Sequence, residues 1–136
     1  MSKSVPEGCV FLMEKPEDIM RKFKRAVTDS DTERWVRYDP ETKPGVSNLM
    51  SIYAAVTGKT YEDIEREFDG KGYGAFKPAV GEAVVELLRP IREETERLLA
   101  DKAYLESVYR AGAEKASYAA NKTLRKVYKK VGFLPR

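Results

Sequence analysis

The chain has 136 residues, of which 42% are hydrophobic and 35% are charged, a balance that fits one globular domain with a charged surface over an apolar core. It contains one cysteine and no histidine, which excludes an internal disulfide, histidine-containing zinc sites and any mechanism that needs a histidine base. The sequence has neither the roughly 20-residue apolar run of a membrane helix nor a secretory leader, so we expect a cytoplasmic protein.

The net charge of +3 is distributed unevenly. Residues 1–114 contain 18 basic and 22 acidic residues, whereas residues 115–136 contain seven basic residues and no acidic one. A basic tail on a mildly acidic body indicates that the C-terminal end contacts a polyanion.

The first third of the chain predicts one helix between two irregular segments. Residues 1–8 have loop composition, and the apolar run 9–13 is short enough to be a strand or an extended segment. Pro16 suits the first turn of a helix, whose apolar stripe comprises Ile19, Met20, Phe23, Ala26 and Val27. Turn-forming residues then predict a long connection over 28–42.

The remaining sequence predicts a succession of helices. They are expected at about 44–57, from the cap Thr60 onward, at about 76–100 with a kink at Pro90, from the cap Asp101 to a break at Asn121, and from there to Gly132. Leu105, Val108, Ala116 and Ala119 are expected to face inward, as are Leu124, Val127, Tyr128 and Val131. The predicted fold class is all-α, a bundle of about five to six helices with a short extended N-terminal segment.

Two features that resemble catalytic or phosphate-binding sites have simpler structural interpretations. Residues 70–74, Gly-Lys-Gly-Tyr-Gly, lack the preceding strand and the full pattern of a phosphate-binding loop, so we favour a non-regular turn with positive φ at several glycines. The acid pairs Glu93/Glu94 and Glu65/Glu67 lie in amphipathic patterns and are interpreted as solvated helix faces.

Several ordered blocks resemble bacterial-type tryptophanyl-tRNA synthetases. Residues 1–4, Met-Ser-Lys-Ser, match the last four letters of the Lys-Met-Ser-Lys-Ser signature of class I aminoacyl-tRNA synthetases. Residues 43–53 and 70–77 follow in matching order and spacing, with shorter blocks at 26–30, 36–39, 88–91 and 112–116. The first lysine of the signature is absent, and Val5 stands where many relatives have an acid. We therefore expect the C-terminal part of such an enzyme, with residues 1–15 a remnant of the catalytic domain and 16–136 a helical anticodon-binding domain.

The resemblance implies that the full enzyme activates L-tryptophan with ATP and Mg²⁺ and charges tRNA(Trp) as a cytoplasmic homodimer, with no membrane or DNA partner. It assigns ATP binding to Ser2, Lys3 and Ser4, with Lys3 as the catalytic lysine that neutralises charge on the triphosphate. The missing N-terminal catalytic domain would be a further partner, and we expect the isolated chain to need no cofactor and to be inactive alone. No metal ligands are predicted.

The basic tail supplies the candidate tRNA-binding residues. Arg125 and Lys129 are one helical turn apart, as are Lys122 and Lys126, so these four form a stripe, with Tyr118 and Tyr128 interleaved. The full predicted set is Lys115, Lys122, Arg125, Lys126, Lys129 and Lys130.

Three alternatives remain open from the sequence. The basic stripe could be an ordinary solvated helix face. The chain could be a stand-alone, non-catalytic RNA-binding or regulatory module, or a helical interaction protein without an RNA partner. Trp35, in the connection, has no functional assignment beyond a possible packing anchor.

Overall fold

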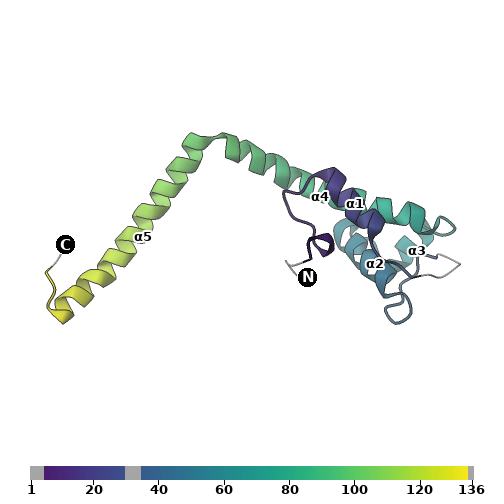
Figure 1. The fold of residues 1–136 in the computed structure, drawn as a ribbon, viewed down its shortest axis with the longest axis horizontal. Coiled ribbons are helices and arrows are strands. Elements are labelled where there is room, and N and C mark those ends of the chain that lie inside the picture. Colours follow the sequence, from purple (N-terminus) through teal and green to yellow (C-terminus); the bar gives the residue numbers. More distant parts are fainter. Residues whose placement is uncertain (1–4, 30–34, 135–136) are drawn as a thin grey trace. The chain divides into compact units, whose positions relative to one another are not determined.

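A computed structural model describes residues 5–29 and 35–134, and these residues form an all-α structure (Figure 1). They contain five α-helices, one short 3-10 helix and no strand, which confirms the predicted fold class. The elements are η1 Pro6–Gly8, α1 Pro16–Arg25, α2 Pro44–Thr57, α3 Tyr61–Glu67, α4 Gly72–Ala100 and α5 Lys102–Val131. The chain divides into two compact units, Met1–Glu93 (unit 1) and Glu94–Arg136 (unit 2).

The helix ends are set by local side chains and glycines. Thr60 Oγ1 accepts the backbone N–H of Asp63 at 3.2 Å, and Asp101 Oδ1 accepts that of Tyr104 at 2.9 Å. Gly58, at φ 74°, ends α2 in the left-handed conformation that glycine adopts without steric cost. These caps confirm the predicted starts of α3 and α5 and the predicted end of α2.

The hydrophobic core belongs to unit 1 and joins its four helices. Its largest fully buried side chains include Ile19 from α1, Met50 from α2, Ile64 from α3 and Phe76 from α4. Phe76 meets the ring of Phe68 edge-on at a centroid distance of 5.0 Å. Of the apolar stripe predicted for α1, Ile19 and Phe23 are buried in the core, whereas Val27 lies beyond α1 and is exposed.

The apolar run 9–13 is neither a strand nor fully extended. Cys9 is buried, but residues 11–14 close a turn in which Glu14 N donates to Phe11 O at 3.0 Å. Lys22 holds this segment against α1, because its ammonium group lies 2.5 Å from Glu14 Oε1 and donates to the carbonyl of Cys9 at 2.7 Å.

Two predicted helix boundaries are wrong. The segment 70–74 is partly regular, because α4 begins at Gly72; positive φ occurs at Gly70 and Gly72, and Gly74 is already helical. Asn121 does not break the chain, since α5 runs unbroken from Lys102 to Val131. Asparagine in a helix interior costs well under ~1 kcal/mol relative to alanine, and the flanking residues outweigh it.

The inward orientation predicted for the residues of the last helical region is also wrong. All of α5 is described, and none of its residues is buried. Leu105 and Tyr128 are partly covered, whereas Val108, Ala116, Ala119, Leu124, Val127 and Val131 are exposed. Helical periodicity identifies the apolar side of a helix, but it does not supply a surface that covers that side.

Candidate nucleic-acid interface

The six basic residues predicted to bind tRNA all lie on α5 and are exposed. With about 100° per residue, they occupy an arc of about 140° on the helix surface and extend over about 22 Å of its axis. The opposite side of the same segment contains Leu124, Val127 and Val131. The C-terminal half of α5 is therefore amphipathic, with one basic face, which is defined here by Lys115, Lys122, Arg125, Lys126, Lys129 and Lys130.

No carboxylate of the described residues neutralises the cations of the basic face. No ion pair involves any of the six within the described residues, and no acidic residue occurs between 115 and 136. Earlier in α5, by contrast, Arg110 pairs with Glu106 at 2.6 Å. The six charges are consequently available to an external polyanion such as a phosphate backbone.

The two interleaved tyrosines differ in availability. Tyr118 lies within the arc of the basic face and is 76% exposed. Tyr128 lies outside that arc and packs edge-on, at a centroid distance of 5.9 Å, against Phe133, which follows the α5 C-cap Gly132. Only Tyr118 therefore combines exposure with a place among the cations. The predicted ATP-binding residues Ser2, Lys3 and Ser4 lie outside the described residues.

Unit 1 contains a polar centre that the sequence did not predict. Tyr73 donates to Asp29 Oδ2 at 2.7 Å, and the ammonium group of Lys43 lies 3.3 Å from the Tyr73 hydroxyl and 3.5 Å from Asp29 Oδ1. Burial raises the pKa of the Tyr73 phenol, and the hydrogen bond to Asp29 raises it further. Asp29, Lys43 and Tyr73 belong to three different sequence blocks that resemble the synthetases, 26–30, 43–53 and 70–77. The polar centre therefore brings these three blocks together.

A second set of contacts fixes the connection that leads into α2. Asp39 accepts hydrogen bonds from the Thr42 hydroxyl at 2.6 Å and from the backbone N–H of Thr42 at 3.0 Å, and these lower the pKa of its carboxyl. Asp39 N donates to the buried Ser47 Oγ at 2.9 Å. The block at 36–39 is thereby tied to α2.

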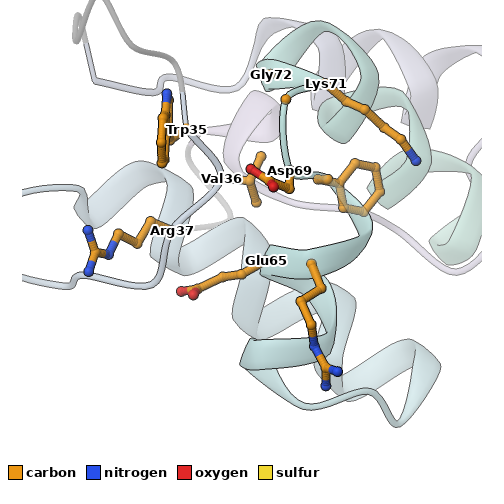
Figure 2. Close-up of a pocket in the computed structure, with 10 residues that line it drawn as sticks. Trp35, Val36, Arg37, Glu65, Asp69, Lys71 and Gly72 are labelled. Atoms are coloured by element: carbon orange, nitrogen blue, oxygen red, sulfur yellow. The ribbon is translucent and has the colours of Figure 1, made fainter.

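Next to this connection is a cavity of about 530 Å³ (Figure 2). Trp35, Val36 and Arg37 form one wall, and the end of α3 with the turn into α4 forms the other. Lys71 also lines the cavity, but in Figure 2 its ammonium group points away from Trp35. The sequence analysis gave Trp35 no functional assignment, and in the structure it lies in this wall of the cavity.

The described residues contain no cluster of His, Cys, Asp or Glu side chains that could hold a metal ion. No helix in the described part of the chain is long and apolar enough to cross a membrane.

Comparison with known proteins decides the family. The family model described as "tRNA synthetases class I (W and Y)" matches residues 1–89. The chain belongs to this synthetase family. The matched region contains the polar centre and the cavity, whereas α5 lies beyond it.

Individual relatives place the chain within the synthetase family. It is 49% identical over 136 residues to the tryptophan–tRNA ligase of Clostridium tetani, covering 98% of this chain and 39% of the relative. The tryptophan–tRNA ligase of Clostridium perfringens is 49% identical over 138 residues, covering 100% of this chain and 41% of the relative. The crystal structure of tryptophanyl-tRNA synthetase from Mycoplasma pneumoniae matches with a TM-score of 0.64 and 29% identity, covering 98% of this chain and 42% of that one.

These comparisons confirm the predicted resemblance to tryptophan–tRNA ligases. The chain spans about 40% of the length of the relatives that it matches. Because these matches cover nearly the whole chain, they include the basic face of α5 as well as unit 1.

Proposed function

We propose that the chain is the tRNA-binding portion of a tryptophan–tRNA ligase and that the basic face of α5 contacts the phosphates of tRNA(Trp). The main support is the set of six exposed cations on one helix face, none of which has a carboxylate partner among the described residues. The similarity to tryptophan–tRNA ligases supports the choice of tRNA over other polyanions. In the whole enzyme we expect tRNA binding to serve the charging of tRNA(Trp) with ATP-activated L-tryptophan.

Several features of the predicted enzyme remain proposals. These are the homodimer, the role of magnesium, ATP binding by Ser2, Lys3 and Ser4, catalysis by Lys3, and a domain boundary at residue 16. The chain contributes affinity for RNA, and this affinity does not depend on ATP binding at Ser2, Lys3 and Ser4.

The test neutralises two cations of the basic face. The double variant Arg125→Gln/Lys129→Gln should bind tRNA(Trp) several-fold more weakly, measured by fluorescence anisotropy of labelled tRNA at several salt concentrations. Each lost phosphate contact also lowers the slope of log affinity against log salt by about 0.9. The double variant should therefore lose about 1.8 from the slope.

A matched control removes the same charge elsewhere on α5. Lys102 and Arg110 lie outside the arc of the basic face, so Lys102→Gln/Arg110→Gln should leave the salt slope almost unchanged. Equal losses in both double variants would mean that net charge alone attracts the RNA. Unchanged affinity in the Arg125/Lys129 variant would refute the proposed contact.

Recognition of the anticodon is a separate question that uses the same assay. If the chain carries the recognition surface, tRNA(Trp) should bind more tightly than a copy with a substituted anticodon. Equal and weak binding of both RNAs would assign anticodon recognition to a part of the enzyme outside this chain.

A further inference from the structure

Trp35 is a large aromatic residue that the fold does not use for its core. Its side chain is 58% exposed and lines the cavity shown in Figure 2. Among the described residues its ring has no aromatic or cationic partner, and its indole N–H has no acceptor. An exposed indole in the wall of a cavity is a surface on which a planar ligand can stack.

The wall that contains Trp35 is held in place by its neighbours. Val36, the next residue, is buried with 6% exposure. Tyr38 N donates to Glu65 Oε1 at 2.8 Å, and the Tyr38 ring stacks on Tyr61 at a centroid distance of 3.9 Å. These contacts join the connection to α3, so the cavity exists before any ligand arrives, which lowers the entropic cost of binding.

The polar groups of the cavity differ in availability. Arg66 is engaged by Asp63, and the ammonium group of Lys71 lies 5.7 Å from the centre of the Phe68 ring. Asp69 has no ion pair or side-chain hydrogen bond among the described residues, whereas the charge of Arg37 interacts with Asp39. The cavity therefore offers a flat aromatic surface and a carboxylate that accepts hydrogen bonds, whereas in Figure 2 the guanidinium group of Arg37 points away from Asp69.

This combination matches one class of ligand. An unpaired nucleobase stacks on an aromatic ring, and its exocyclic amino group donates a hydrogen bond to a carboxylate. A volume of about 530 Å³ also lies in the range of small-ligand sites. Uracil lacks an exocyclic amino group and would leave the carboxylate without a donor.

We propose that this cavity holds an unpaired, amino-bearing nucleobase of an RNA strand, stacked on Trp35, with its amino group donating a hydrogen bond to Asp69. The proposal rests on the proposed function, because it assumes an RNA ligand. It assigns base recognition to unit 1, in addition to the phosphate contacts proposed for α5.

Trp35 is the only tryptophan in the chain, so intrinsic tryptophan fluorescence reports on this site alone. We would titrate the chain with a labelled hairpin of the anticodon arm of tRNA(Trp), recording hairpin anisotropy and tryptophan emission together. Stacking should quench the emission and saturate at the same concentration as the anisotropy. Replacing loop cytosines by uracil should weaken the quenching.

Variants then test the individual roles by anisotropy. Trp35→Leu should weaken hairpin binding by about 5- to 150-fold, the range expected for one stacked base, and Trp35→Phe by only a few-fold. Asp69→Asn should reduce the preference for cytosine over uracil, because an amide can also donate to a uracil carbonyl. Tyr109→Leu, an exposed aromatic on α5 outside the cavity, is the matched control and should bind normally.

The outcomes separate this proposal from the proposed function. If the hairpin binds with unchanged tryptophan emission and Trp35→Leu binds as well as wild type, the cavity proposal is refuted and RNA binding by α5 stands. If neither the hairpin nor full-length tRNA(Trp) changes the anisotropy, both proposals fail. Equal quenching by the cytosine and uracil hairpins would refute the role of Asp69. Quenching by an arginine-rich peptide, with no quenching by RNA, would refute the nucleobase proposal and identify a binding site for a cationic side chain.

Discussion

At the scale of single residues, two glycines set how closely the helices of unit 1 pack. A Cβ atom on Gly45 would lie 2.4 Å from the carbonyl oxygen of Val27, and one on Gly81 would lie 2.8 Å from Met20 Sδ. The first neighbour is backbone and cannot turn aside, whereas the second is in a flexible side chain. Gly45 is therefore the position where α2 depends on the absence of a side chain.

We expect Gly45→Ala to lower the free energy of unfolding by about 1–3 kcal/mol, because the backbone of α2 or of the preceding connection has to move. Gly74→Ala is the control. Gly74 is helical with open space around it, so alanine should raise the free energy of unfolding by about 0.5–1 kcal/mol. Urea unfolding measures both. Equal effects of the two substitutions would contradict the packing argument.

The polar centre predicts a pH dependence at high pH. Burial raises the pKa of Tyr73 above its ordinary value of 10.0, so the folded state holds the phenol proton more tightly than the unfolded state. This contribution to stability is complete below about pH 10 and is lost as the pH rises through the folded-state pKa. Tyr73→Phe should therefore show a smaller loss of stability above pH 10 than wild type, measured by urea unfolding across pH.

The same variant should also be less stable at pH 7. It removes the hydroxyl between Asp29 and Lys43 and should cost about 1–2 kcal/mol. An identical pH profile in Tyr73→Phe and wild type would mean that the tyrosine does not titrate differently in the folded state.

At the scale of elements, α5 depends on local interactions because none of its residues is buried. Its first turn is fixed by Asp101, whose carboxylate accepts the N–H of Tyr104. Isolated helices are marginally stable in water, so end effects matter more here than in a helix packed in a core.

Asp101→Ala should therefore destabilise the first turn of α5 by about 1 kcal/mol. Amide hydrogen exchange should become about 5-fold faster in that turn, with little change in α2 and α3. Asp101→Asn retains a capping oxygen and should exchange like wild type. Faster exchange spread evenly over unit 1 would contradict a local role for this cap.

These elements also show how far prediction from sequence reached. Thr60, Asp101 and Gly58 each cap the helix end next to them in the sequence, so local sequence patterns were sufficient to predict these helix ends. The polar centre was missed because it joins residues 44 positions apart, Asp29 and Tyr73, which no local pattern connects. The basic face was predicted because charge and helical spacing are both local, whereas the cavity at Trp35 depends on the packing of a connection against α3.

At the scale of the whole molecule, the buried hydrophobic residues within 5–29 and 35–134 run from Cys9 to Leu88 and all lie in unit 1. The family match to residues 1–89 covers the same span. Unit 1 has a core of its own, and the basic face of α5 belongs to unit 2. Stability and the proposed phosphate binding are therefore assigned to different parts of the chain.

A chain truncated after Ala100 should accordingly unfold cooperatively, with a free energy of unfolding within about 0.5 kcal/mol of the full chain. It should also lose most of its salt-dependent affinity for tRNA. Urea unfolding and the anisotropy assay check the two expectations. A truncated chain that unfolds without cooperativity would show that α5 contributes to the stability of unit 1.

The ion pairs of Lys22 and Lys43 have a consequence for chemical reactivity. The side chains of these two lysines are only 17% and 12% exposed, and each ammonium group is held by a carboxylate, Glu14 for Lys22 and Asp29 for Lys43. An acylating reagent needs an accessible, deprotonated amine, so it will modify the lysines of the basic face long before it reaches these two. Acylation of Lys22 therefore reports release of the N-terminal segment from α1, and acylation of Lys43 reports opening of the polar centre.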